Sequence, residues 1–502
     1  MINIIMEKIY AYKINESELE IYCSEIGVIE ELYYYFRYRK PNFMPNRYSK
    51  WDGIIRLFNK KTGRLPLGLY SMLVQWCRIN EYELIDDEPR VSKTVGDKTV
   101  NKFIGSLNLP ENIVPYDYQI KALKLAIELD RYVCHAATSA GKSLIIYMIS
   151  RYYQLLGSKI LIIVPSTNLV NQMYDDFYAY SKSSDWNAFE HCHRIYAGLE
   201  KSFDKSITIS TWQSLQKCDQ ESLDVFDTVL VDECHKANAD VLTKLLKACS
   251  SAYARIGFTG SLNQNTSNGY HPVSVQASFG PIHNIVSSKE LRDSGKATKT
   301  AVKMIELLYG NEDRFEVSQM SYQDEIQWLI HNEKRNNMIH KVVEKLSGNT
   351  LILCNFKDHV DNLYDIISKT KKVYVITGDV KTEDRDEIKR RVESETGVVV
   401  IATAGTMSTG VSIKNLHNLV LSAPTKSFVT VVQSVGRVMR LHDSKDVSLI
   451  IDFSDNLKRM VDNKNRINYS YKHSIERLTY YADEKHDVKL CKIKMEKRNG
   501  KD

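Results

Sequence analysis

Short apolar segments alternate with longer segments of helix length over most of the chain after residue 115. Apolar runs without polar alternation are typical of strands that are buried on both faces of a sheet. In the first half of the chain these runs lie at Tyr132–Cys134, Lys159–Val164, Ile207–Ser210, Thr228–Val231 and Arg255–Phe258. The pattern predicts a parallel sheet with helices on both faces.

The same pattern returns after a loop at 263–269 that is rich in Asn, Ser and Thr. Its apolar runs lie at Thr350–Cys354, Lys372–Ile376, Gly397–Ala402, Asn418–Leu421 and Val447–Ile451. The fold class predicted is therefore α/β, with two parallel-sheet lobes in tandem at residues 115–290 and 291–455.

The two ends of the chain differ from these lobes. Residues 1–90 mix strand-like runs (Lys8–Ile14, Ile54–Phe58) with a helical pattern at Gly68–Ile79, which predicts a small α+β accessory domain. Residues 91–114 contain proline and glycine and are expected to form a linker. Residues 456–502 are basic and have a helical pattern at Ser474–Tyr481, so a short helical C-terminal extension is expected.

Length and composition narrow the class of protein. A chain of 502 residues exceeds what one hydrophobic core supports, and 43% hydrophobic with 26% charged residues argues against a disordered chain. No stretch approaches the roughly 18 to 20 apolar residues that cross a bilayer. We therefore expect a cytoplasmic protein without a membrane partner. We also expect it to be a monomer.

Positive charge is concentrated at the two ends. The segment 33–64 holds nine Lys or Arg residues and one Asp, and 456–502 carries a further +6, so the rest of the chain is at −8 within a net charge of +6. Clustered positive charge of this kind favours a polyanionic partner.

The basic N-terminal segment also contains nine aromatic residues. Two interpretations remain open. The segment can bind nucleic acid through phosphate contacts and base stacking, or its aromatic residues can form the core of a small domain with solvated lysines. Under the first interpretation the candidate nucleic-acid contacts are Arg37, Arg39, Lys40, Arg47 and Trp51.

A phosphate-binding loop is predicted at Ala136–Ser143, between an apolar run and a helical segment. A turn from strand to helix presents backbone N–H groups and a helix N-terminus to phosphate oxygens. Lys142 would neutralise phosphate charge and Ser143 would ligate Mg²⁺. The loop residues expected to contact the nucleotide are Thr138, Ser139, Ala140, Gly141, Lys142 and Ser143. Position 136, where the usual first glycine lies, is alanine.

Two carboxylates follow the apolar run Thr228–Val231. At the end of a buried strand, Asp232 can hold Mg²⁺ and Glu233 can orient and deprotonate an attacking water. The alternative is an acidic strand end that caps a neighbouring helix. The phosphate loop about 90 residues upstream, in the same alternating block, favours the catalytic interpretation.

From Pro115 to Asp452 the chain resembles the superfamily two helicases, whose lobes are RecA-like. Tyr118 and Gln119 are similar to the family's adenine-reading motif. The other similar segments are 137–143 (motif I), 164–172 (Ia), 210–215 (Ib), 232–235 (II), 259–261 (III), 352–356 (IV), 402–413 (V) and 433–440 (VI). The resemblance implies backbone contacts from Thr167, Thr211, Trp212 and Thr403 and a nucleotide contact at Gly410. Ser412 stands where many relatives carry an acidic residue.

Motif VI contains Gln433, Arg437 and Arg440, which we expect to be catalytic. The two arginines are three residues apart, so they share one face if the segment is helical. Arginine suits the charge that develops on a transferring phosphoryl group. Without the other motifs, two surface arginines on an amphipathic helix would be the simpler interpretation.

The N-terminal segments 43–57 and 65–69 and the C-terminal segment 475–485 are similar to the UvsW-type family of phage helicases. This resemblance implies an ATP- and Mg²⁺-dependent DNA helicase that acts on Holliday junctions, stalled forks, D-loops and R-loops in recombination, repair and replication. Its partners would be branched double-stranded and single-stranded DNA and RNA–DNA hybrids. Alternative functions are a double-strand DNA translocase, an RNA helicase, or a nucleic-acid-binding protein without motor activity.

Overall fold

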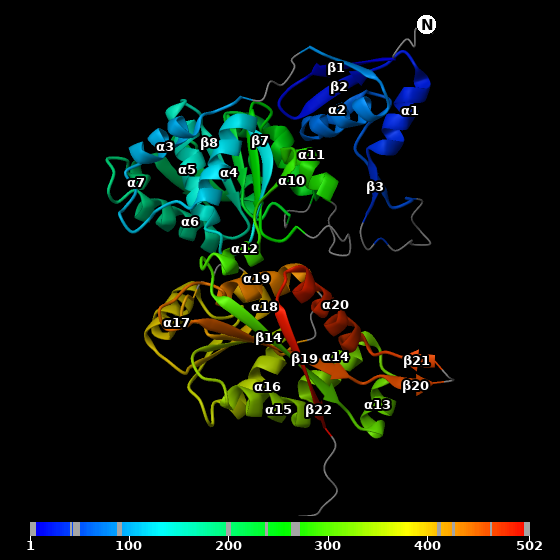
Figure 1. Ribbon diagram of the computed structural model, residues 1–502, viewed down its shortest axis with the longest axis vertical. Helices are drawn as coiled ribbons and strands as arrows, with labels where there is room; N and C mark the ends of the chain where they lie inside the picture. The colour runs from blue at the N-terminus through cyan, green and yellow to red at the C-terminus, as the bar shows by residue number, and fades with distance from the viewer. Residues whose placement is uncertain are drawn as a thin grey trace, which may run out of the picture. The chain divides into compact units, whose positions relative to one another are not determined.

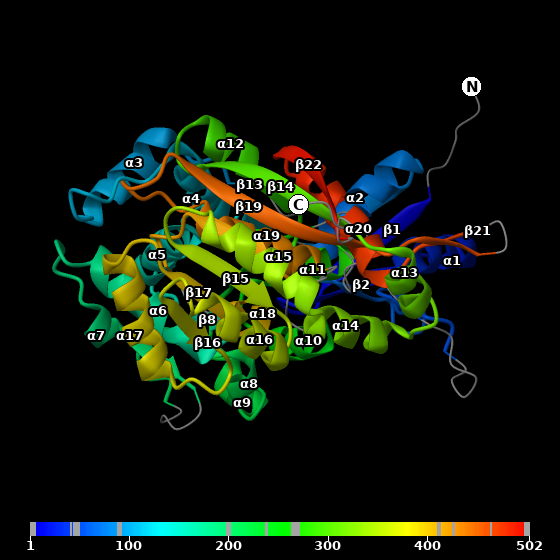
Figure 2. The ribbon, with the colours of Figure 1, turned by 90° about the horizontal axis from the view of Figure 1, so that it is seen from below.

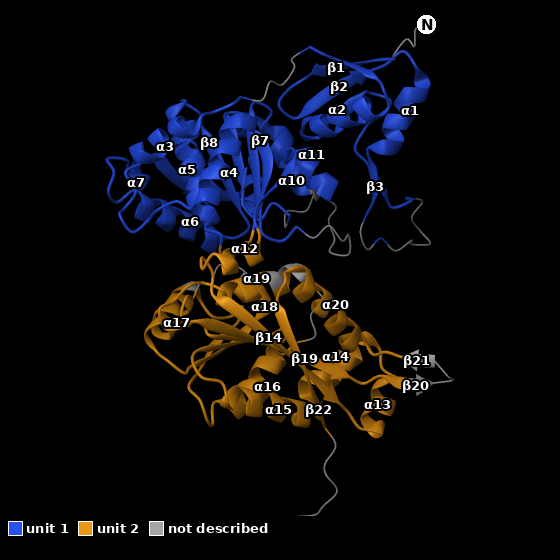
Figure 3. Ribbon diagram, viewed as in Figure 1, with its two compact units in different colours: residues 1–136, 140–286 blue, residues 137–139, 287–502 orange. Residues whose placement is uncertain are grey.

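The computed structural model describes residues 7–40, 43, 51–87, 93–196, 202–235, 239–262, 272–408, 413–423, 427–461 and 464–495. The chain divides into two compact units, as Figure 3 shows. The first comprises residues 1–136 and 140–286, and the second comprises residues 137–139 and 287–502.

The first unit contains a seven-stranded sheet in the order β13-β7-β12-β11-β8-β10-β9. All neighbouring strands are parallel. The strands are β7 (Arg131–Ala136), β8 (Ile160–Val164), β9 (Cys192–Ile195), β10 (Ile207–Thr211), β11 (Thr228–Val231), β12 (Ala254–Thr259) and β13 (Ile282–Val286). The predicted parallel sheet is thus confirmed, with β9 and β13 added at its edges.

Helices cover both faces of this sheet (Figure 1). The helices α4 (Asp117–Leu129), α5 (Lys142–Leu155) and α6 (Thr167–Tyr180) contact β7, β8 and β10. The other face packs against α8 (Trp212–Leu215), α9 (Gln220–Leu223), α10 (Ala239–Ala248) and α11 (Pro272–Phe279). The short α7 (Ala188–His191) precedes β9. Fully buried strands such as Ile160–Val164 lack polar positions because both of their faces meet helices.

The N-terminal part of the first unit has its own four-stranded sheet, in the order β5-β2-β1-β6. Its strands are β1 (Lys8–Lys13), β2 (Glu18–Tyr22), β5 (Arg64–Pro66) and β6 (Glu83–Asp86). The helices α1 (Ile26–Tyr35) and α2 (Tyr70–Ile79) accompany it, with a 3₁₀ turn at Leu67–Leu69. A separate hairpin pairs β3 (Arg37–Arg39) with β4 (Ile54–Arg56).

This N-terminal part packs directly on the first parallel-sheet lobe. The guanidinium of Arg255 donates to the hydroxyl of Ser17 at 2.9 Å, and that hydroxyl donates to the carbonyl of Leu246 at 3.2 Å. Gly68 lies so close to α11 that a Cβ there would be 2.2 Å from the carbonyl oxygen of Gln276. Buried hydrogen bonds and this backbone contact fix the two parts to each other.

The expected linker 91–114 contains a helix, α3 (Asp97–Ser106). Val100 is the single buried residue of this helix, so the sequence has only a weak apolar pattern here. Asp97 accepts an ion pair from Lys124 of α4 at 2.7 Å, and Phe103 packs edge-on against Tyr152 of α5. The connection therefore lies on the lobe as an ordered element.

The second unit contains another seven-stranded parallel sheet, in the order β16-β17-β15-β18-β19-β14-β22. Its strands are β14 (Lys299–Leu308), β15 (Thr350–Cys354), β16 (Val373–Ile376), β17 (Val399–Thr403), β18 (Asn418–Leu421), β19 (Val447–Asn456) and β22 (Asp487–Lys494). Five were predicted. The sequence pattern did not predict β14 or β22.

Helices again cover both faces of the sheet (Figures 1 and 2). One face packs against α15 (Glu333–Glu344) and α16 (Lys357–Ile367) around a core that includes Ile339, Leu363 and Ile401. The helices α18 (Ala404–Ser408), α19 (Phe428–Val438) and α20 (Tyr469–Asp483) contact β17, β18 and β19. The remaining helices are α12 (Ser288–Asp293), α13 (Asn311–Val317), α14 (Tyr322–His331) and α17 (Thr382–Ser394).

The C-terminal segment is part of this second lobe. It contains the expected helix, as α20, and a hairpin of β20 (Arg459–Val461) and β21 (Lys464–Arg466). It then returns to the sheet as the edge strand β22, parallel to β14. Within the described part of the chain, no helix is long and apolar enough to cross a membrane.

Candidate functional site

The motifs of the first lobe gather at one edge of its sheet. The phosphate loop follows β7, Asp232 follows β11, and Thr259 ends β12, which lies between β7 and β11 in the sheet. Thr167 follows β8 and Thr211 ends β10. Because all these strands are parallel, their carboxyl ends share one edge, which is where ligands bind in open α/β sheets.

The phosphate loop makes its turn with two residues in the left-handed region. Ser139 has φ 73° and Gly141 has φ 70°. Gly141 is the N-cap of α5, and Lys142 is the first residue of that helix. The loop therefore leads into the N-terminus of a fourteen-residue helix, the position at which backbone N–H groups attract phosphate.

Ala136 does not disturb this turn. It is the last residue of β7, is fully buried, and pairs with Val286 of β13. The chain is extended at this point, so a Cβ is accommodated. The alanine in place of the usual glycine thus lies before the tight part of the loop.

Gln119 supports the phosphate loop from α4. Its amide Nε2 donates to the carbonyls of Ala140 and Gly141, at 3.0 and 3.3 Å, and its Oε1 accepts the N–H of Tyr116 at 2.9 Å. The side chain is 3% exposed. Gln119 and Tyr118 were predicted to read adenine, but the amide group of Gln119 is committed to the loop in this structure. Tyr118 lies beside Tyr116, with ring centroids 5.6 Å apart.

Ser143, the predicted Mg²⁺ ligand of the loop, lies in the first turn of α5. Its hydroxyl is 2.8 Å from the hydroxyl of Tyr180, at the end of α6. Desolvation by burial raises the pKa of Tyr180, so this phenol stays neutral. When the Ser143 O–H donates to Tyr180, the Ser143 oxygen keeps lone pairs that can ligate a metal ion.

The acid pair lies directly after β11. The backbone N–H of Asp232 continues the sheet by donating to Ile163 at 2.9 Å, and the N–H of Glu233 donates to the Asp232 carboxylate at 2.9 Å. Glu233 has φ 50°, a left-handed conformation that costs a non-glycine residue energy and is often found at functional sites.

A histidine connects this acid pair to the neighbouring strand. His235 Nδ1 lies 2.7 Å from the hydroxyl of Thr259 and 3.4 Å from the Glu233 carboxylate. The Thr259 hydroxyl also accepts the N–H of Ser261 at 3.1 Å. The segment 232–235 is thereby joined to the segment 259–261 through buried side chains.

The predicted nucleic-acid contacts of the first lobe have different surroundings. Thr167 is exposed at the start of α6. Thr211 is buried and caps α8 by accepting the N–H of Ser214 at 3.3 Å, so its hydroxyl has a structural role. Trp212 is partly buried against the core of the lobe.

Thr138 and Ser139 of the phosphate loop belong to the second compact unit, whereas the loop residues from Ala140 onward belong to the first. In that unit Gln433 and Arg437 lie on α19, where Gln433 is buried and Arg437 is half-buried. The helix ends at Val438, so Arg440 lies beyond it. The shared helix face was expected only if the whole segment were helical, and that condition is not met at Arg440 because α19 ends at Val438. The carbonyl of Arg440 accepts the hydroxyl of Thr298 at 3.0 Å.

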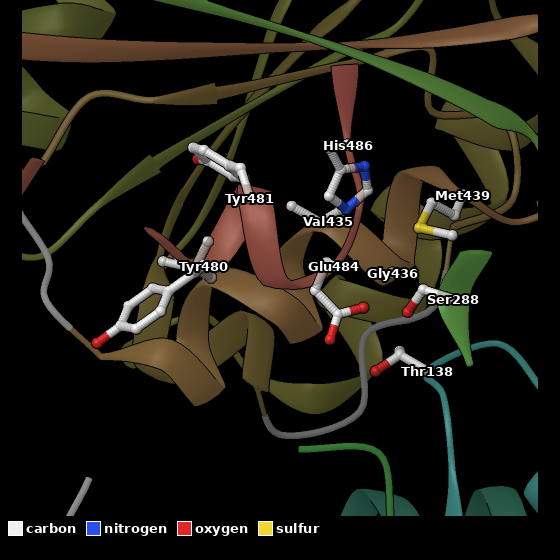
Figure 4. Close-up of a pocket in the computed structure, with 10 residues that line it drawn as sticks. Thr138, Ser288, Val435, Gly436, Met439, Tyr480, Tyr481, Glu484 and His486 are labelled. Atoms are coloured by element: carbon white, nitrogen blue, oxygen red, sulfur yellow. The ribbon is translucent and has the colours of Figure 1, made fainter. Parts of the chain in front are cut away.

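The helix α19 is held by the C-terminal segment. Figure 4 shows Val435 and Met439 around a small pocket with Tyr481 and His486. His486 Nδ1 lies 2.7 Å from the hydroxyl of Thr300 on β14. Desolvation by burial lowers the pKa of His486 to about 3, so its ring is neutral.

The remaining predicted residues of the second lobe follow β17. Thr403 ends that strand, and its hydroxyl lies 2.8 Å from the hydroxyl of Thr406. Gly410 and Ser412 lie outside the described residues, as does Arg47 of the N-terminal segment.

The N-terminal basic segment divides its aromatic residues between two roles. Phe36, Tyr38 and Phe58 are buried, whereas Tyr34 and Trp51 are 55% and 42% exposed. Part of the segment therefore forms the core of the small domain, while binding of nucleic acid by its exposed residues stays a prediction.

Its basic residues differ in the same way. Arg56 pairs with Asp52 at 2.5 Å and Lys60 with Glu30 at 2.5 Å. Arg37 and Arg39 are exposed on β3, and no ion pair involving either of them or Lys40 is found among the described residues. The Arg37 guanidinium lies 4.4 Å from the Tyr34 ring, and Lys40 lies 5.6 Å from the Trp51 ring. Among the described residues, Arg37, Arg39 and Lys40 are thus available cations of this surface.

The geometry of the first lobe, a phosphate loop and an acid pair at the carboxyl edge of a RecA-like sheet, defines a P-loop ATPase. Residues 112–264 match the family model described as type III restriction enzyme, res subunit, and residues 333–442 match the helicase conserved C-terminal domain.

A phage protein matches nearly the whole chain. The ATP-dependent DNA helicase uvsW of Enterobacteria phage T4 is 31% identical over 493 residues, which cover 93% of this chain and 96% of that protein. The crystal structure of T4 UvsW covers 97% of this chain and 100% of its own, with 29% identity and a TM-score of 0.51. The chain belongs to the UvsW family of ATP-dependent superfamily two helicases.

A more distant structure shows the fold alone. It is the ATP-dependent type ISP restriction-modification enzyme LlaBIII bound to DNA, at 13% identity and a TM-score of 0.54, covering 76% of this chain and 32% of its own.

Three residues near these motifs were not predicted as site residues. Tyr180 contacts the predicted Ser143, Thr259 contacts His235 of motif II, and Lys445 contacts the last turn of α19. Thr259 lies within a motif and could have been chosen from the sequence. Tyr180 and Lys445 belong to no motif, and no signal in a single sequence marks them.

Proposed function

We propose that this ATP-dependent helicase unwinds or branch-migrates branched DNA, namely Holliday junctions, forks, D-loops and R-loops, as a monomer in the host cytoplasm. The observation that carries the proposal is the match to a DNA helicase along 93% of the chain, which includes the N-terminal part as well as the motor lobes. The exposed cations and aromatic rings of the β3–β4 hairpin support it, because they suit phosphate contacts and stacking on unpaired bases at a junction.

In this proposal Lys142 and the N-terminus of α5 bind the ATP phosphates. Ser143 and Asp232 offer a hydroxyl and a carboxylate, the hard oxygen ligands that Mg²⁺ prefers, so the donor set fits this ion. Glu233 orients and deprotonates the attacking water. Arg437 and Arg440, from the second lobe, stabilise the charge on the transferring phosphoryl group.

ATP hydrolysis with and without a four-way DNA junction tests the motor. Lys142→Ala and Glu233→Gln are expected to lower turnover by at least a hundredfold, because each removes charge stabilisation or base catalysis. Junction-stimulated hydrolysis that survives in both variants would refute the assignment of the site.

The salt dependence of junction binding tests the N-terminal surface. Neutralising Arg37, Arg39 and Lys40 to Gln is expected to reduce the slope of log K against log salt by up to about 0.9 per lost phosphate contact, while basal hydrolysis survives. Lys60→Gln is a matched control, since Lys60 is already paired with Glu30. Equal slopes in all variants would show that this surface has a structural role only.

A substrate panel separates the alternatives. Unwinding of forks, junctions and R-loops in preference to blunt duplex is the expected result. Preference for RNA duplexes would indicate an RNA helicase, and hydrolysis on duplex DNA without unwinding would indicate a translocase.

A further inference from the structure

A pocket of about 270 Å³ lies in the second unit, away from every motif discussed above. It is bounded by the end of α13, the start of α14 and the segment that joins β21 to α20. Figure 1 shows these elements together at one side of the lobe. The residues that matter here are Val317, Ser318, Leu457, Arg466, Tyr469 and Lys472.

The floor of the pocket is apolar and one wall is aromatic. Val317 and Leu457 are buried beneath it. Tyr469 is 44% exposed, and its ring packs edge-on against Tyr322 with centroids 5.6 Å apart. An aromatic ring held in this way keeps a face on which another ring can stack.

The rim of the pocket is basic. Arg466 and Lys472 are exposed, and no ion pair is found for either one in the part of the chain that the structure describes. The Lys472 ammonium lies 5.6 Å from the centroid of the Tyr469 ring. The pocket therefore offers positive charge for phosphate oxygens directly beside the aromatic wall.

The polar groups inside the pocket are already engaged. The Glu325 carboxylate accepts the backbone N–H groups of Tyr469 and Ser470, at 2.9 and 2.7 Å, and the Asn468 amide at 3.0 Å. Asn468 Oδ1 accepts the N–H of Leu457 at 3.0 Å. These two side chains hold the start of α20, so they cannot read the edges of a base.

We infer that this pocket binds one unpaired nucleotide of a single nucleic-acid strand. The base stacks on Tyr469 above the apolar floor, and the flanking phosphates contact Arg466 and Lys472. The volume lies just below the roughly 300 to 1,000 Å³ of ordinary ligand pockets, which suits one nucleotide. Stacking without base-edge contacts makes the site independent of sequence. The inference rests on the proposed function, since it supplies a contact for a displaced strand.

The charge contribution is tested by anisotropy with a fluorescent dT₂₀ strand in the absence of ATP. Arg466→Gln with Lys472→Gln is expected to reduce the slope of log K against log salt by about 1.4, at roughly 0.7 per phosphate for a single strand. Lys341→Gln with Lys345→Gln removes the same charge from exposed residues of this lobe that do not line the pocket. That control is expected to retain the wild-type slope.

The stacking contribution is tested at Tyr469. Tyr469→Leu keeps apolar bulk and is expected to weaken binding roughly 5- to 150-fold, the range seen for loss of one stacked base. Tyr469→Phe keeps the ring and is expected to bind within twofold of wild type. A 2-aminopurine strand should lose fluorescence on binding to wild type and Tyr469→Phe, and lose less on Tyr469→Leu.

The outcomes are distinguishable from failure of the proposed function. Basal ATP hydrolysis and thermal unfolding of the variants should match wild type, which shows that they are folded. If wild type binds the strand and all pocket variants bind it equally with the same slope, the pocket inference alone is wrong. If wild type binds neither strand nor junction, the proposed function fails and the inference fails with it.

Discussion

The ammonium nitrogen of Lys445 lies 2.9 Å from the carbonyl oxygen of Val438, the last residue of the helix that carries Arg437. The same nitrogen donates to the carbonyls of Leu416 and Lys414, at 2.7 and 3.1 Å. Lys414 directly follows motif V. One buried cation therefore joins the end of motif V to the end of the motif VI helix.

Turnover should fall as pH rises through about 8. Desolvation by burial, and then the nearby Arg440, lower the pKa of Lys445 to about 8, while Glu393 opposes that shift. Above this pH the neutral amine has two N–H donors for three carbonyl oxygens, so one of the three contacts is lost. A pH profile of DNA-stimulated hydrolysis checks this. Lys445→Arg should keep activity above pH 8, whereas Lys445→Met should be impaired at every pH.

The stability of the protein should not follow the same curve. Because the folded pKa of Lys445 is below its ordinary value of 10.5, the unfolded chain holds more protons between about pH 8 and 10.5. The titration of Lys445 therefore raises the free energy of unfolding as pH rises in that window, because the proton is lost from the folded protein first. Urea unfolding at pH 7.5 and 9 separates the two effects. If stability and activity fall together as pH rises, and fall by the same amount in wild type and Lys445→Arg, a positioning role for Lys445 is contradicted.

Gln119 is expected to act on the phosphate loop rather than on the base. Its amide holds the carbonyls of Ala140 and Gly141. Gln119→Ala should therefore reduce kcat/KM for ATP and GTP by similar factors, about tenfold for a loss of roughly 1 to 2 kcal/mol in loop support. Steady-state kinetics with both nucleotides check this. A loss confined to ATP would restore the adenine-reading role that the motif predicts.

Thr259→Val should separate hydrolysis from its stimulation by DNA. The substitution removes the hydroxyl that contacts His235 and Ser261 but keeps the branched shape of a buried side chain. Basal hydrolysis should stay within about threefold of wild type, because Lys142, Asp232 and Glu233 are untouched. Stimulation by a DNA junction should fall by about tenfold, the scale of one lost buried hydrogen bond. Equal losses with and without DNA would show that Thr259 acts only on the acid pair.

Much of the fold could be predicted because buried parallel strands are uninterrupted apolar runs. Thr228–Val231, Thr350–Cys354 and Asn418–Leu421 are strands with the predicted bounds. The strands β14 and β22 were missed because Lys299 and Lys303 on β14 and the lysines of β22 break the apolar pattern. β22 is an edge strand with one side open to solvent, so its sequence carries a weaker signal, whereas β14 lies between β19 and β22.

In the candidate site, the sequence likewise predicts the position of a residue in the fold better than the contacts of its side chain. Motif order places Lys142, Asp232 and Arg437 on the right elements, because strand ends and helix starts are local features. It cannot show that α19 ends at Val438 before Arg440, or that the Gln119 amide is committed to the loop. Those facts depend on contacts made in the folded chain, such as that of Lys445 with Val438 and that of Thr298 with Arg440, which is 142 residues away.

Acid should destabilise the second lobe through His486. Burial, and then Arg292, lower the pKa of His486 to about 3 from 6.5. Between these values the unfolded chain binds more protons, so the free energy of unfolding falls as pH falls below 6.5, by about 2 kcal/mol at pH 5. Thermal unfolding from pH 7.5 to 5 measures this.

His486→Gln removes one titrating group and should make the acid limb shallower, even if the variant is less stable at neutral pH through its changed contact with Thr300. Part of the limb should remain, because burial also lowers the pKa of His359 in this lobe. His331→Gln, at an exposed position of α14, is the control and should keep the wild-type pH dependence. Because His486 lines the pocket beside Val435 and Met439, its protonation should also disturb α19. Loss of DNA-stimulated hydrolysis should then precede global unfolding as the pH is lowered, and an identical acid limb in wild type and His486→Gln would assign the effect to other groups.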